Sequence, residues 1–501
     1  MISKIYSAAV IGLDAELVEV EADVTNGLPA TIVVGLPDTA VQEARERVKA
    51  AIKNSEGSYP QTRVSVNLAP ADIPKLGTHF DLPIALAILL AYEQINFDPA
   101  GKLFLGELSL DGSLRPVPGV LAIALKAQKE GFKEIYIPYE NLKEAALVSG
   151  IKIFGIKNLS ELLKHLLLIN KISEAETLDL RTILVNTEAN LDMKDVAGQE
   201  LAKRALEIAA SGSHNILLFG PPGSGKTLLA RAMAGILPNL SLEEALELTK
   251  IYSIAGKLSQ NFVTSRPVRS PHHTTSNVAL VGGGANPKPG EITLSHRGIL
   301  FLDEFPEFPR NVLEALRQPL EDGIVTVSRA SGSFTFPAKF TLVAAQNPCP
   351  CGYFGDGSQK CQCSPMQIFK YQKKISGPLL DRIDLHVEVQ RLPYEKMTGE
   401  ENNENSSSIK QRVEAARRKQ SQRFKSSKTN SEMNVVEIKK YCTIKEDGQL
   451  LLSQAMKKYN FSGRSLHRIL KVARTIADLA NSENITTQHL AEAIQYRPKS
   501  E

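Results

Sequence analysis

The sequence predicts an α/β protein with a central nucleotide-binding domain and a helical C-terminal segment. Three observations predict this class. An apolar run from Ile216 to Phe219 leads into a glycine-rich loop, and a helical stretch from Leu228 to Leu237 follows it. Strand, loop and helix patterns then recur between Asp195 and about Val389, as in parallel nucleotide-binding sheets. The tail from Val435 to Arg497 has helical periodicity throughout.

The glycine-rich loop reads FGPPGSGKT from Phe219 to Thr227 and fits the spacing G-x-x-x-x-G-K-[ST]. Glycines let the backbone wrap a phosphate, so that N–H groups and a helix N-terminus point at negative charge. We expect Lys226 to reach the β- and γ-phosphates of ATP and Thr227 to offer its hydroxyl to Mg²⁺. The predicted nucleotide-binding residues are Gly220, Pro221, Pro222, Gly223, Ser224, Gly225, Lys226 and Thr227.

Two later strand patterns end in side chains suited to phosphate chemistry. Gly298 to Leu302 is an apolar strand followed by Asp303 and Glu304. Because ligands bind at the carboxyl ends of parallel strands, Asp303 should hold Mg²⁺ and Glu304 should orient the attacking water. The next strand, Lys339 to Ala345, ends in Gln346 and Asn347, and we expect the Asn347 amide to lie near the γ-phosphate.

Composition and length exclude several classes of protein. The 501 residues indicate about three domains, and a formal net charge of +4 means that any nucleic-acid site must be a local patch. Five cysteines in a chain of this size do not form a disulfide scaffold. The N-terminus turns acidic too soon for a signal peptide, and the longest apolar stretch, Leu82 to Tyr92, is too short to cross a membrane. We therefore expect a cytoplasmic protein without membrane contact.

The pattern divides the chain into five segments. They are an N-terminal domain of short strands and apolar helices, a polar linker, the nucleotide-binding core, an acidic and then basic segment, and a helical lid, at residues 1–170, 171–192, 193–395, 396–430 and 431–501. In the fourth segment, Thr398 to Ser408 reads as a mobile acidic loop, and Lys410 to Lys428 holds eight Lys or Arg against one Glu. That basic run is either a solvated helix face or a contact for a phosphate backbone.

Longer motifs make the family specific. The P-loop, the strand ending in Asp303 and Glu304, the Asn347 strand and SGPLLDRID (Ser376 to Asp384) follow one another in the order of an AAA+ ATPase. LFLDEFPEFPRNVLEALRQPLEDG (Leu300 to Gly323) and NPCPCG (Asn347 to Gly352) resemble the magnesium-chelatase-like YifB/ComM family, and the resemblance covers essentially the whole chain.

The resemblance implies further roles. Asn347 matches sensor 1, Arg382 matches the arginine finger that reaches a neighbouring subunit's site, and Arg464 matches the nucleotide-sensing arginine of the lid. DVAGQE (Asp195 to Glu200) resembles the segment that packs on adenine. From the residues alone, Arg382 could instead pair with Asp381 or Asp384 of its own chain, and Arg468 could replace Arg464 one helical turn later.

Two insertions interrupt the core, Val278 to Leu294 and Gly323 to Phe340. The second has alternating strand residues on both sides of a short turn, which predicts a β-hairpin. Both resemble the helix-2 insert and pre-sensor-1 hairpin that face the pore of ring helicases. Lys288 and Arg329 near their tips are candidate contacts for DNA phosphates, although Arg329 could be an ordinary surface charge on a hairpin turn.

The N-terminal segments Val66 to Leu86 and Gly106 to Val120 resemble the proteolytic domain of Lon proteases, an α+β fold of the ribosomal S5 domain 2 type. That enzyme needs a serine activated by a lysine. The serine region holds Thr78, His79 and Asp81, and the lysine region is Leu121 to Ile123, with no amine. The sequence therefore predicts a protease fold without protease activity.

Four cysteines, Cys349, Cys351, Cys361 and Cys363, lie within fifteen residues directly after Asn347. In a reducing compartment such a cluster favours a structural Zn²⁺ site, with free thiols as the alternative. His272, His273 and His296 form a weaker metal candidate, for which loop packing is the simpler interpretation.

The resemblance implies a Mg²⁺-dependent ATPase assembled as a homo-oligomeric ring, a hexamer, that moves along DNA. In this family the implied role is branch migration during recombination of DNA imported in natural transformation, alongside recombination proteins. Two alternatives stay open at this point. One is a chelatase-type motor for metal insertion into a tetrapyrrole, and the other is an ATP-dependent protease or unfoldase.

Overall fold

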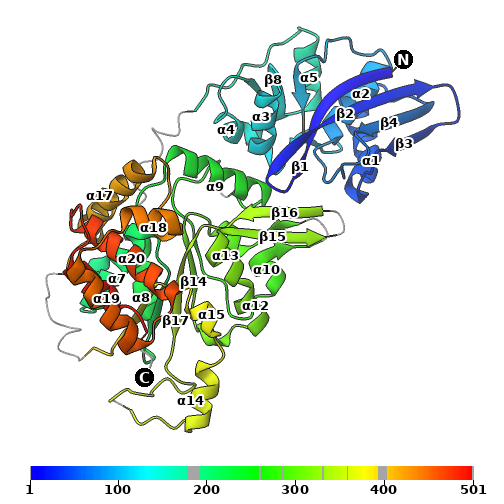
Figure 1. Ribbon diagram of the computed structural model, residues 1–501. Helices are drawn as coiled ribbons and strands as arrows, with labels where there is room; N and C mark the ends of the chain where they lie inside the picture. The colour runs from blue at the N-terminus through cyan, green and yellow to red at the C-terminus, as the bar shows by residue number, and fades with distance from the viewer. Residues whose placement is uncertain are drawn as a thin grey trace. The chain divides into compact units, whose positions relative to one another are not determined.

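The computed structural model describes residues 2–178, 191–258, 261–284, 287–329, 332–357, 359–392 and 403–498. The chain forms two compact units, Met1–Ile183 with Ala245–Val263, and Leu184–Glu244 with Thr264–Glu501 (Figure 1). Much of the predicted linker and of the predicted acidic loop, at residues 179–190 and 393–402, lies outside the described residues.

One boundary differs from the sequence prediction, because residues 245–263 group with the N-terminal unit instead of the nucleotide-binding core. They belong to helix α9 (Leu242–Ile254) and the segment after it. The side chains of this helix explain the grouping. Ser253 Oγ accepts a hydrogen bond of 2.8 Å from Gly119 N, and Lys250 Nζ lies 2.7 Å from Asp14 Oδ1.

The first unit is built on a seven-stranded mixed sheet of order β3-β4-β2-β1-β5-β8-β9. Its strands are β1 (Ile2–Ile11), β2 (Asp14–Thr25), β3 (Ala30–Val34), β4 (Arg63–Ala69), β5 (Lys102–Phe104), β8 (Glu134–Pro138) and β9 (Lys152–Ile156). Its main helices are α1 (Thr39–Asn54), α2 (Asp81–Ala91), α3 (Val120–Lys129) and α5 (Leu159–Leu166). The predicted strand at Arg63–Leu68 and helix at Leu82–Ala91 are confirmed as β4 and α2.

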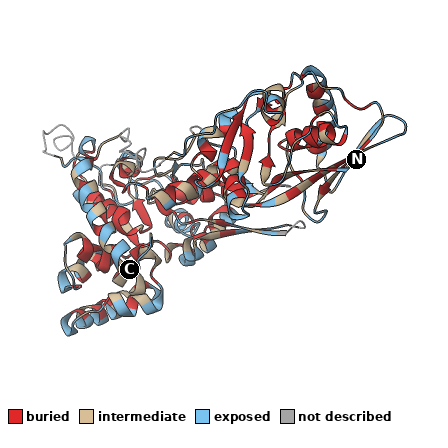
Figure 2. Ribbon diagram, turned by 90° about the horizontal axis from the view of Figure 1, so that it is seen from above, coloured by how far each residue is buried: buried red, intermediate tan, exposed pale blue. Residues whose placement is uncertain are grey.

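Alternating strand residues supply two separate cores in this unit. Ile135 and Ile137 pack with α3 on one face, and Tyr136 between them packs with α1, α2 and α5 on the other. This is the period-two alternation expected of a sheet covered by helices on both faces. Figure 2 shows the buried positions along the strands and inner helix surfaces.

The second unit is built on a five-stranded parallel sheet of order β11-β14-β17-β10-β18. Its strands are β10 (Ile216–Phe219), β11 (Val268–Arg269), β14 (Ile299–Leu302), β17 (Thr341–Gln346) and β18 (Leu385–Glu388). The core strands are almost wholly apolar, as expected where helices cover both faces of a parallel sheet. The predicted parallel α/β core and the strands before Lys226, Glu304 and Asn347 are therefore confirmed.

Helices of the second unit fall into two sets. Those connected with the sheet are α7 (Glu200–Gly212), α8 (Lys226–Ala232), α12 (Arg310–Ala315), α13 (Arg317–Asp322), α14 (Pro365–Gln372) and α15 (Gly377–Leu380). The C-terminal set is α17 (Ser406–Phe424), α18 (Val435–Tyr441), α19 (Glu446–Tyr459), α20 (Gly463–Leu479) and α21 (Thr487–Gln495). Apolar residues of α20 recur at helical spacing and share one core with the sheet, α7 and α8.

The two predicted insertions have their own secondary structure. The first contains α10 (Asn277–Val281), the short strands β12 (Gly282–Gly283) and β13 (Lys288–Pro289), and α11 (Glu291–Leu294). The second is the predicted hairpin, in which β15 (Ile324–Arg329) pairs antiparallel with β16 (Gly332–Pro337). Lys288 is exposed on β13, whereas Arg329 ends β15 and its side chain lies outside the description.

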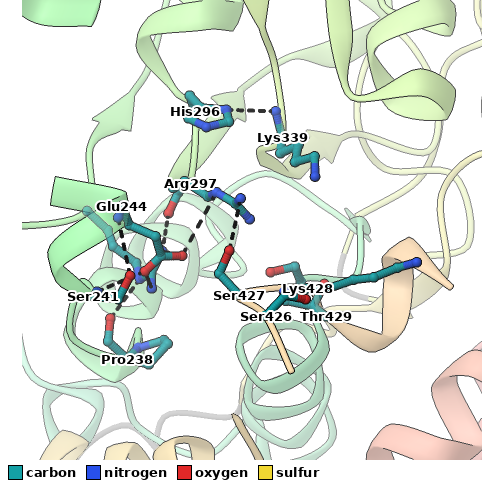
Figure 3. A network of polar contacts seen from close by, with 12 residues as sticks. Pro238, Ser241, Glu244, His296, Arg297, Lys339, Ser426, Ser427, Lys428 and Thr429 are labelled. Atoms are coloured by element: carbon teal, nitrogen blue, oxygen red, sulfur yellow. Dashed lines mark hydrogen bonds and ion pairs between the residues drawn. The ribbon is translucent and has the colours of Figure 1, made fainter. Parts of the chain in front are cut away.

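A buried ion-pair network surrounds Glu244 of the second unit (Figure 3). The Glu244 side chain is 7% exposed and accepts a hydrogen bond of 2.7 Å from Arg266 Nη2. Arg297 Nε lies 3.9 Å from the same carboxylate, and Arg297 Nη2 donates to Ser427 Oγ at 3.2 Å. Burial alone would raise the pKa of Glu244, but Arg266 and Arg297 outweigh it and hold the pKa below its usual value.

Glu244→Gln is expected to destabilise the second unit by about 3–5 kcal/mol at pH 7, because it leaves buried guanidinium groups without their carboxylate. A carboxylate with a lowered folded pKa stabilises above its unfolded pKa of about 4.3, and this contribution is lost as pH falls through the folded value. The difference from wild type should therefore shrink below about pH 4. Urea unfolding of both proteins at pH 7 and below pH 4 measures this difference in the free energy of unfolding. The control is Glu243→Gln, at the exposed neighbour, and equal unfolding of both variants at pH 7 would contradict the prediction.

Candidate functional site

The P-loop connects β10 to α8 at the carboxyl ends of the parallel strands. Gly223 and Gly225 have φ angles of 75° and 93°, in the left-handed region that favours glycine. Lys226 is almost fully buried, and its Nζ donates hydrogen bonds of 2.8 Å to the carbonyl oxygens of Gly220 and Pro221. Burial lowers the pKa of Lys226 to about 8, although the nearby Asp303 opposes this shift. An anionic phosphate beside this amine would favour its charged form.

The two predicted Mg²⁺ ligands meet directly. Thr227 Oγ1 donates a hydrogen bond of 2.8 Å to Asp303 Oδ2. Thr227 lies in the first turn of α8 and Asp303 directly follows β14, so the contact joins two elements that are 76 residues apart. A hydroxyl and a carboxylate oxygen at this spacing suit a hard divalent cation. The donor set therefore fits Mg²⁺.

Glu304 follows Asp303 in a conformation that non-glycine residues seldom adopt, with φ 50° and ψ 44°. Its backbone N–H donates to Asp303 Oδ1 at 2.9 Å, and its side chain is 55% exposed. Strained backbone of this kind is concentrated at functional sites. The Glu304 carboxylate lies 3.2 Å from Nδ1 of His273, a contact that no motif in the sequence predicts.

Asn347 is the third polar residue at a strand end. It directly follows β17, which pairs with both β10 and β14. Gly220 N donates to Gln346 O at 3.2 Å, so the beginning of the P-loop contacts the residue before Asn347. The structure thus brings the P-loop, Asp303, Glu304 and Asn347 to one edge of the sheet.

The two predicted arginines, Arg382 and Arg464, lie on the opposite side of the sheet from the P-loop, at the amino ends of the strands. Arg382 precedes β18, and a strand of four residues separates that end from the P-loop edge by about 13 Å. The Arg382 side chain is 8% exposed, contacts the Glu321 carboxylate and donates to Pro378 O at 2.7 Å. Arg464 Nη2 lies 3.0 Å from the other oxygen of Glu321. Both arginines therefore share one carboxylate on α13, and Asp381 and Asp384 are not the partners of Arg382.

Arg468, the proposed substitute for Arg464, has a different role. It contacts the buried Asp384 carboxylate, which His214 Nδ1 also approaches at 3.3 Å. Burial alone would raise the pKa of Asp384, but Arg468 and His214 keep it well below its usual range. A cavity of about 690 Å³ opens at this edge of the sheet, and its lining includes Glu321, Arg464 and Arg468.

The four cysteines lie on the segment between β17 and α14, and Figure 1 shows the course of its backbone. Their four sulfur atoms lie within 4.8 Å of one another, with Cys349 3.4 Å from Cys351 and 3.8 Å from Cys361. Four thiolates at about 2.3 Å from a tetrahedral Zn²⁺ would be about 3.8 Å apart. Hydrogen bonds from the backbone of Tyr353 and Gln362 lower the pKa of Cys351 to about 6. The cluster fits Zn²⁺.

The histidines do not gather into a comparable group, since the cysteine cluster is the only such candidate among the described residues. His296 is buried and its Nδ1 accepts from Lys339 N at 3.0 Å (Figure 3). His272 Nδ1 lies 2.9 Å from Thr274 Oγ1. These contacts agree with the loop-packing interpretation.

Much of the charge of the basic run from Lys410 to Lys428 is used inside the second unit. Arg412 pairs with Glu207 at 2.5 Å, Arg423 pairs with Asp478 at 2.5 Å, and Lys428 pairs with Glu437 at 2.6 Å. Arg417 donates to Ala210 O at 2.9 Å. This run is therefore neither a purely solvated face nor a row of free cations.

The residues at the positions of the predicted missing protease dyad have partners or are buried within the first unit. The Thr78 hydroxyl donates to the Glu107 carboxylate, and the buried Asp81 accepts from Arg47 Nε at 2.7 Å. Burial raises the pKa of Asp81 to about 6 and lowers that of His79 to about 4. Leu121 to Ile123 are buried apolar residues of α3, so this position provides no base for a nucleophile.

No helix in the described ranges has the length and hydropathy to span a bilayer.

Comparison with known proteins agrees with this geometry. Residues 192–397 match the family model "Magnesium chelatase, subunit ChlI", residues 20–141 match "Subunit ChlI of Mg-chelatase", and residues 403–497 match "Magnesium chelatase, subunit ChlI C-terminal". The competence protein ComM of Haemophilus influenzae is 44% identical, over 98% of this chain and 97% of its own length.

The protein YifB of Escherichia coli K12 is 43% identical, over 99% of this chain and 97% of its own. The magnesium-chelatase 38 kDa subunit of Rhodobacter capsulatus is 29% identical over 30% of this chain and 49% of its own. Identity of this extent over nearly the full length of ComM and YifB shows that the chain belongs to the magnesium-chelatase-like YifB/ComM family.

Proposed function

We propose that the chain is an AAA+ ATPase that hydrolyses ATP with Mg²⁺. The observation that supports this most directly is the hydrogen bond between Thr227 and Asp303, which joins the end of the P-loop to the strand that carries Glu304. When bound there, Mg²⁺ would neutralise charge on the β- and γ-phosphate oxygens. Phosphate release from ATP, with Lys226→Ala as the reference, tests the proposal. A wild-type rate no higher than that of Lys226→Ala would refute it.

The residues of the chain divide the reaction among them. Lys226 exchanges its bonds to two loop carbonyls for bonds to phosphate oxygens, and the P-loop N–H groups hold the remaining phosphate oxygens. Glu304 orients the attacking water and accepts its proton, while the Asn347 amide bonds the same water or the γ-phosphate. Phosphoryl transfer needs positioning and charge stabilisation more than covalent catalysis, and these side chains provide both.

We further propose that hydrolysis takes place between adjoining subunits of a homo-oligomeric ring, a hexamer. Arg382 and Arg464 supply permanent positive charge at the edge of the sheet opposite their own P-loop. A neighbouring subunit that brought its triphosphate to this edge would meet both guanidinium groups. This arrangement supports Arg382 as the arginine finger and Arg464 as the lid contact with nucleotide.

For the driven polymer we propose DNA, moved during recombination of DNA taken up in natural transformation. The similarity to a competence protein and the paired strands β15 and β16 support this proposal, with Lys288 and Arg329 as the phosphate contacts. The test is ATP turnover with no DNA, single-stranded, duplex and branched DNA, followed by displacement of a labelled strand from a three-stranded junction. An ATPase that ignores all three DNAs and moves no junction contradicts it.

A chelatase-type motor is the second candidate, and the three family models named for a magnesium-chelatase subunit favour it. ATP-dependent metal insertion into a tetrapyrrole by mixtures with a porphyrin-binding partner would support this function. The third alternative is a protease or unfoldase. Thr78 and Leu121 to Ile123 occupy the positions of the Lon serine and lysine, and they include neither residue type. Digestion of casein with ATP tests it directly.

We also propose that Cys349, Cys351, Cys361 and Cys363 hold a structural Zn²⁺. Lys374, beyond α14, lies 2.8 Å from the carboxylate of Glu307, so the far end of this segment returns to the chain just after Glu304. A closed four-thiolate site leaves no coordination position for substrate. The metal would therefore stabilise the segment and take no part in catalysis.

Wild-type protein is expected to contain about one zinc ion per chain, measured with a colorimetric chelator after mercurial release. Cys361→Ser should lose most of this zinc, because three thiolates leave the tetrahedral site incomplete. Cys442→Ser is the matched control, since Cys442 is a buried cysteine of the lid outside the cluster, and it should retain the metal. Zinc-free protein with five titratable thiols would favour the free-thiol alternative.

A further inference from the structure

The carboxylate of Glu304 has a partner outside the nucleotide motifs. His273 Nδ1 lies 3.2 Å from Glu304 Oε2, and their side chains are 32% and 55% exposed. The imidazole of His273 lies near two other rings. Its centroid lies 4.1 Å from that of His272 at an interplanar angle of 34°, and 6.5 Å from that of Phe308 at 82°.

The segment that carries His273 is itself fixed at both ends. It lies between β11 and α10, and Arg269 at the end of β11 pairs with Glu291 of α11 at 2.6 Å. Thr275 N donates to His272 O at 2.9 Å, and Ser276 Oγ accepts from Ala279 N at 3.2 Å to cap α10. A side chain supported in this way is able to hold a partner in one orientation.

The contact restrains Glu304 while leaving half of its carboxylate available. The backbone of Glu304 is held by the left-handed conformation and by the hydrogen bond from its N–H to Asp303. Its exposed side chain needs a further contact to fix its torsions. An ionised carboxylate has about four lone-pair sites, and its contact with His273 involves Oε2. Oε1 remains to accept a hydrogen bond from water.

We propose that His273 is a positioning residue that orients Glu304 toward the attacking water. This inference rests on the proposed ATP hydrolysis. It assigns a function to the HH pair in SPHHTTSN, where His273 contacts Glu304 and the neighbouring His272 supports the imidazole of His273.

The test is steady-state phosphate release by three variants. His273→Ala is expected to lower kcat about 10- to 100-fold, as displacement of a catalytic group by about 1 Å does, with KM for ATP within about twofold of wild type. His273→Asn should restore most of kcat, because its amide nitrogen is able to take the place of Nδ1. His272→Phe keeps a ring against His273 but loses the contact of His272 Nδ1 with Thr274, so it should lower kcat less than His273→Ala does.

A double variant makes the test specific. If His273 acts through Glu304, adding His273→Ala to Glu304→Gln should lower kcat little further, because residues that act as a unit are not additive. Fluorescent-ATP binding at wild-type affinity shows that each variant is folded. A wild-type kcat in His273→Ala, or an equal loss in His273→Asn and His273→Ala, overturns the inference while ATP hydrolysis stands. A wild-type protein no faster than Lys226→Ala overturns both.

Discussion

Replacing Glu304 with glutamine is expected to slow ATP turnover by about 10²- to 10⁴-fold while ATP binding is retained. The amide has nearly the shape of the carboxylate but accepts no proton from the attacking water. The P-loop, the buried Lys226 amine and the contact between Thr227 and Asp303 do not involve the Glu304 side chain. Single-turnover phosphate release measures the chemical step, and titration with a fluorescent ATP analogue measures binding.

Glu307→Gln is the matched control for this experiment. Glu307 lies three residues further on, is 41% exposed, and pairs with Lys374 at 2.8 Å. It shares the charge change but not the position at the end of β14, so turnover should stay within about twofold of wild type. Wild-type turnover in Glu304→Gln would mean that another group orients the water.

Arg382→Ala is expected to lower turnover by about 10³- to 10⁵-fold, the range that arginine fingers contribute to phosphoryl transfer. Its guanidinium would stabilise charge on the transferred phosphoryl group of a neighbouring subunit. Arg382→Lys should recover little, because a lysine keeps the charge but loses the planar fork. ATP binding should be unchanged in both variants, since Arg382 lies at the edge of the sheet opposite its own P-loop.

Mixing two inactive variants distinguishes action across an interface from action within one chain. In rings assembled from equal amounts of Lys226→Ala and Arg382→Ala, about one site in four pairs an intact P-loop with an intact arginine. Partial recovery of turnover is therefore expected on mixing, and none in either variant alone. Recovery requires shared rings, so light scattering should show oligomers with ATP. A mixture that forms rings but stays inactive would exclude the arginine finger in trans.

The candidate nucleotide site at the carboxyl ends of the strands is predictable from sequence, because each of its motifs is a short continuous stretch of chain. A buried apolar run followed by polar residues specifies a strand end, and parallel strands present those ends at one edge. This pattern predicts strands that end before Lys226, Asp303, Glu304 and Asn347, and these residues follow β10, β14 and β17. The hairpin of β15 and β16 was likewise predictable from its alternation of side chains.

Contacts between distant segments were less predictable. The acidic neighbours of Arg382 in sequence are Asp381 and Asp384, but its partner is Glu321, 61 residues earlier. Arg412 finds Glu207, and Arg423 finds Asp478. A run of basic residues in the sequence does not indicate which acidic side chains the fold places beside it. The basic segment is therefore open to two interpretations from sequence alone.

Residue types and their spacing were enough to predict the family, the P-loop motif, the parallel core and the four-cysteine cluster, since each depends on neighbours along the chain. Only the tertiary structure reveals that residues 245–263 group with the N-terminal unit, that Arg382 and Arg464 meet at Glu321, and that His273 contacts Glu304. These depend on which surfaces pack together, and packing selects partners by shape and burial across long stretches of chain.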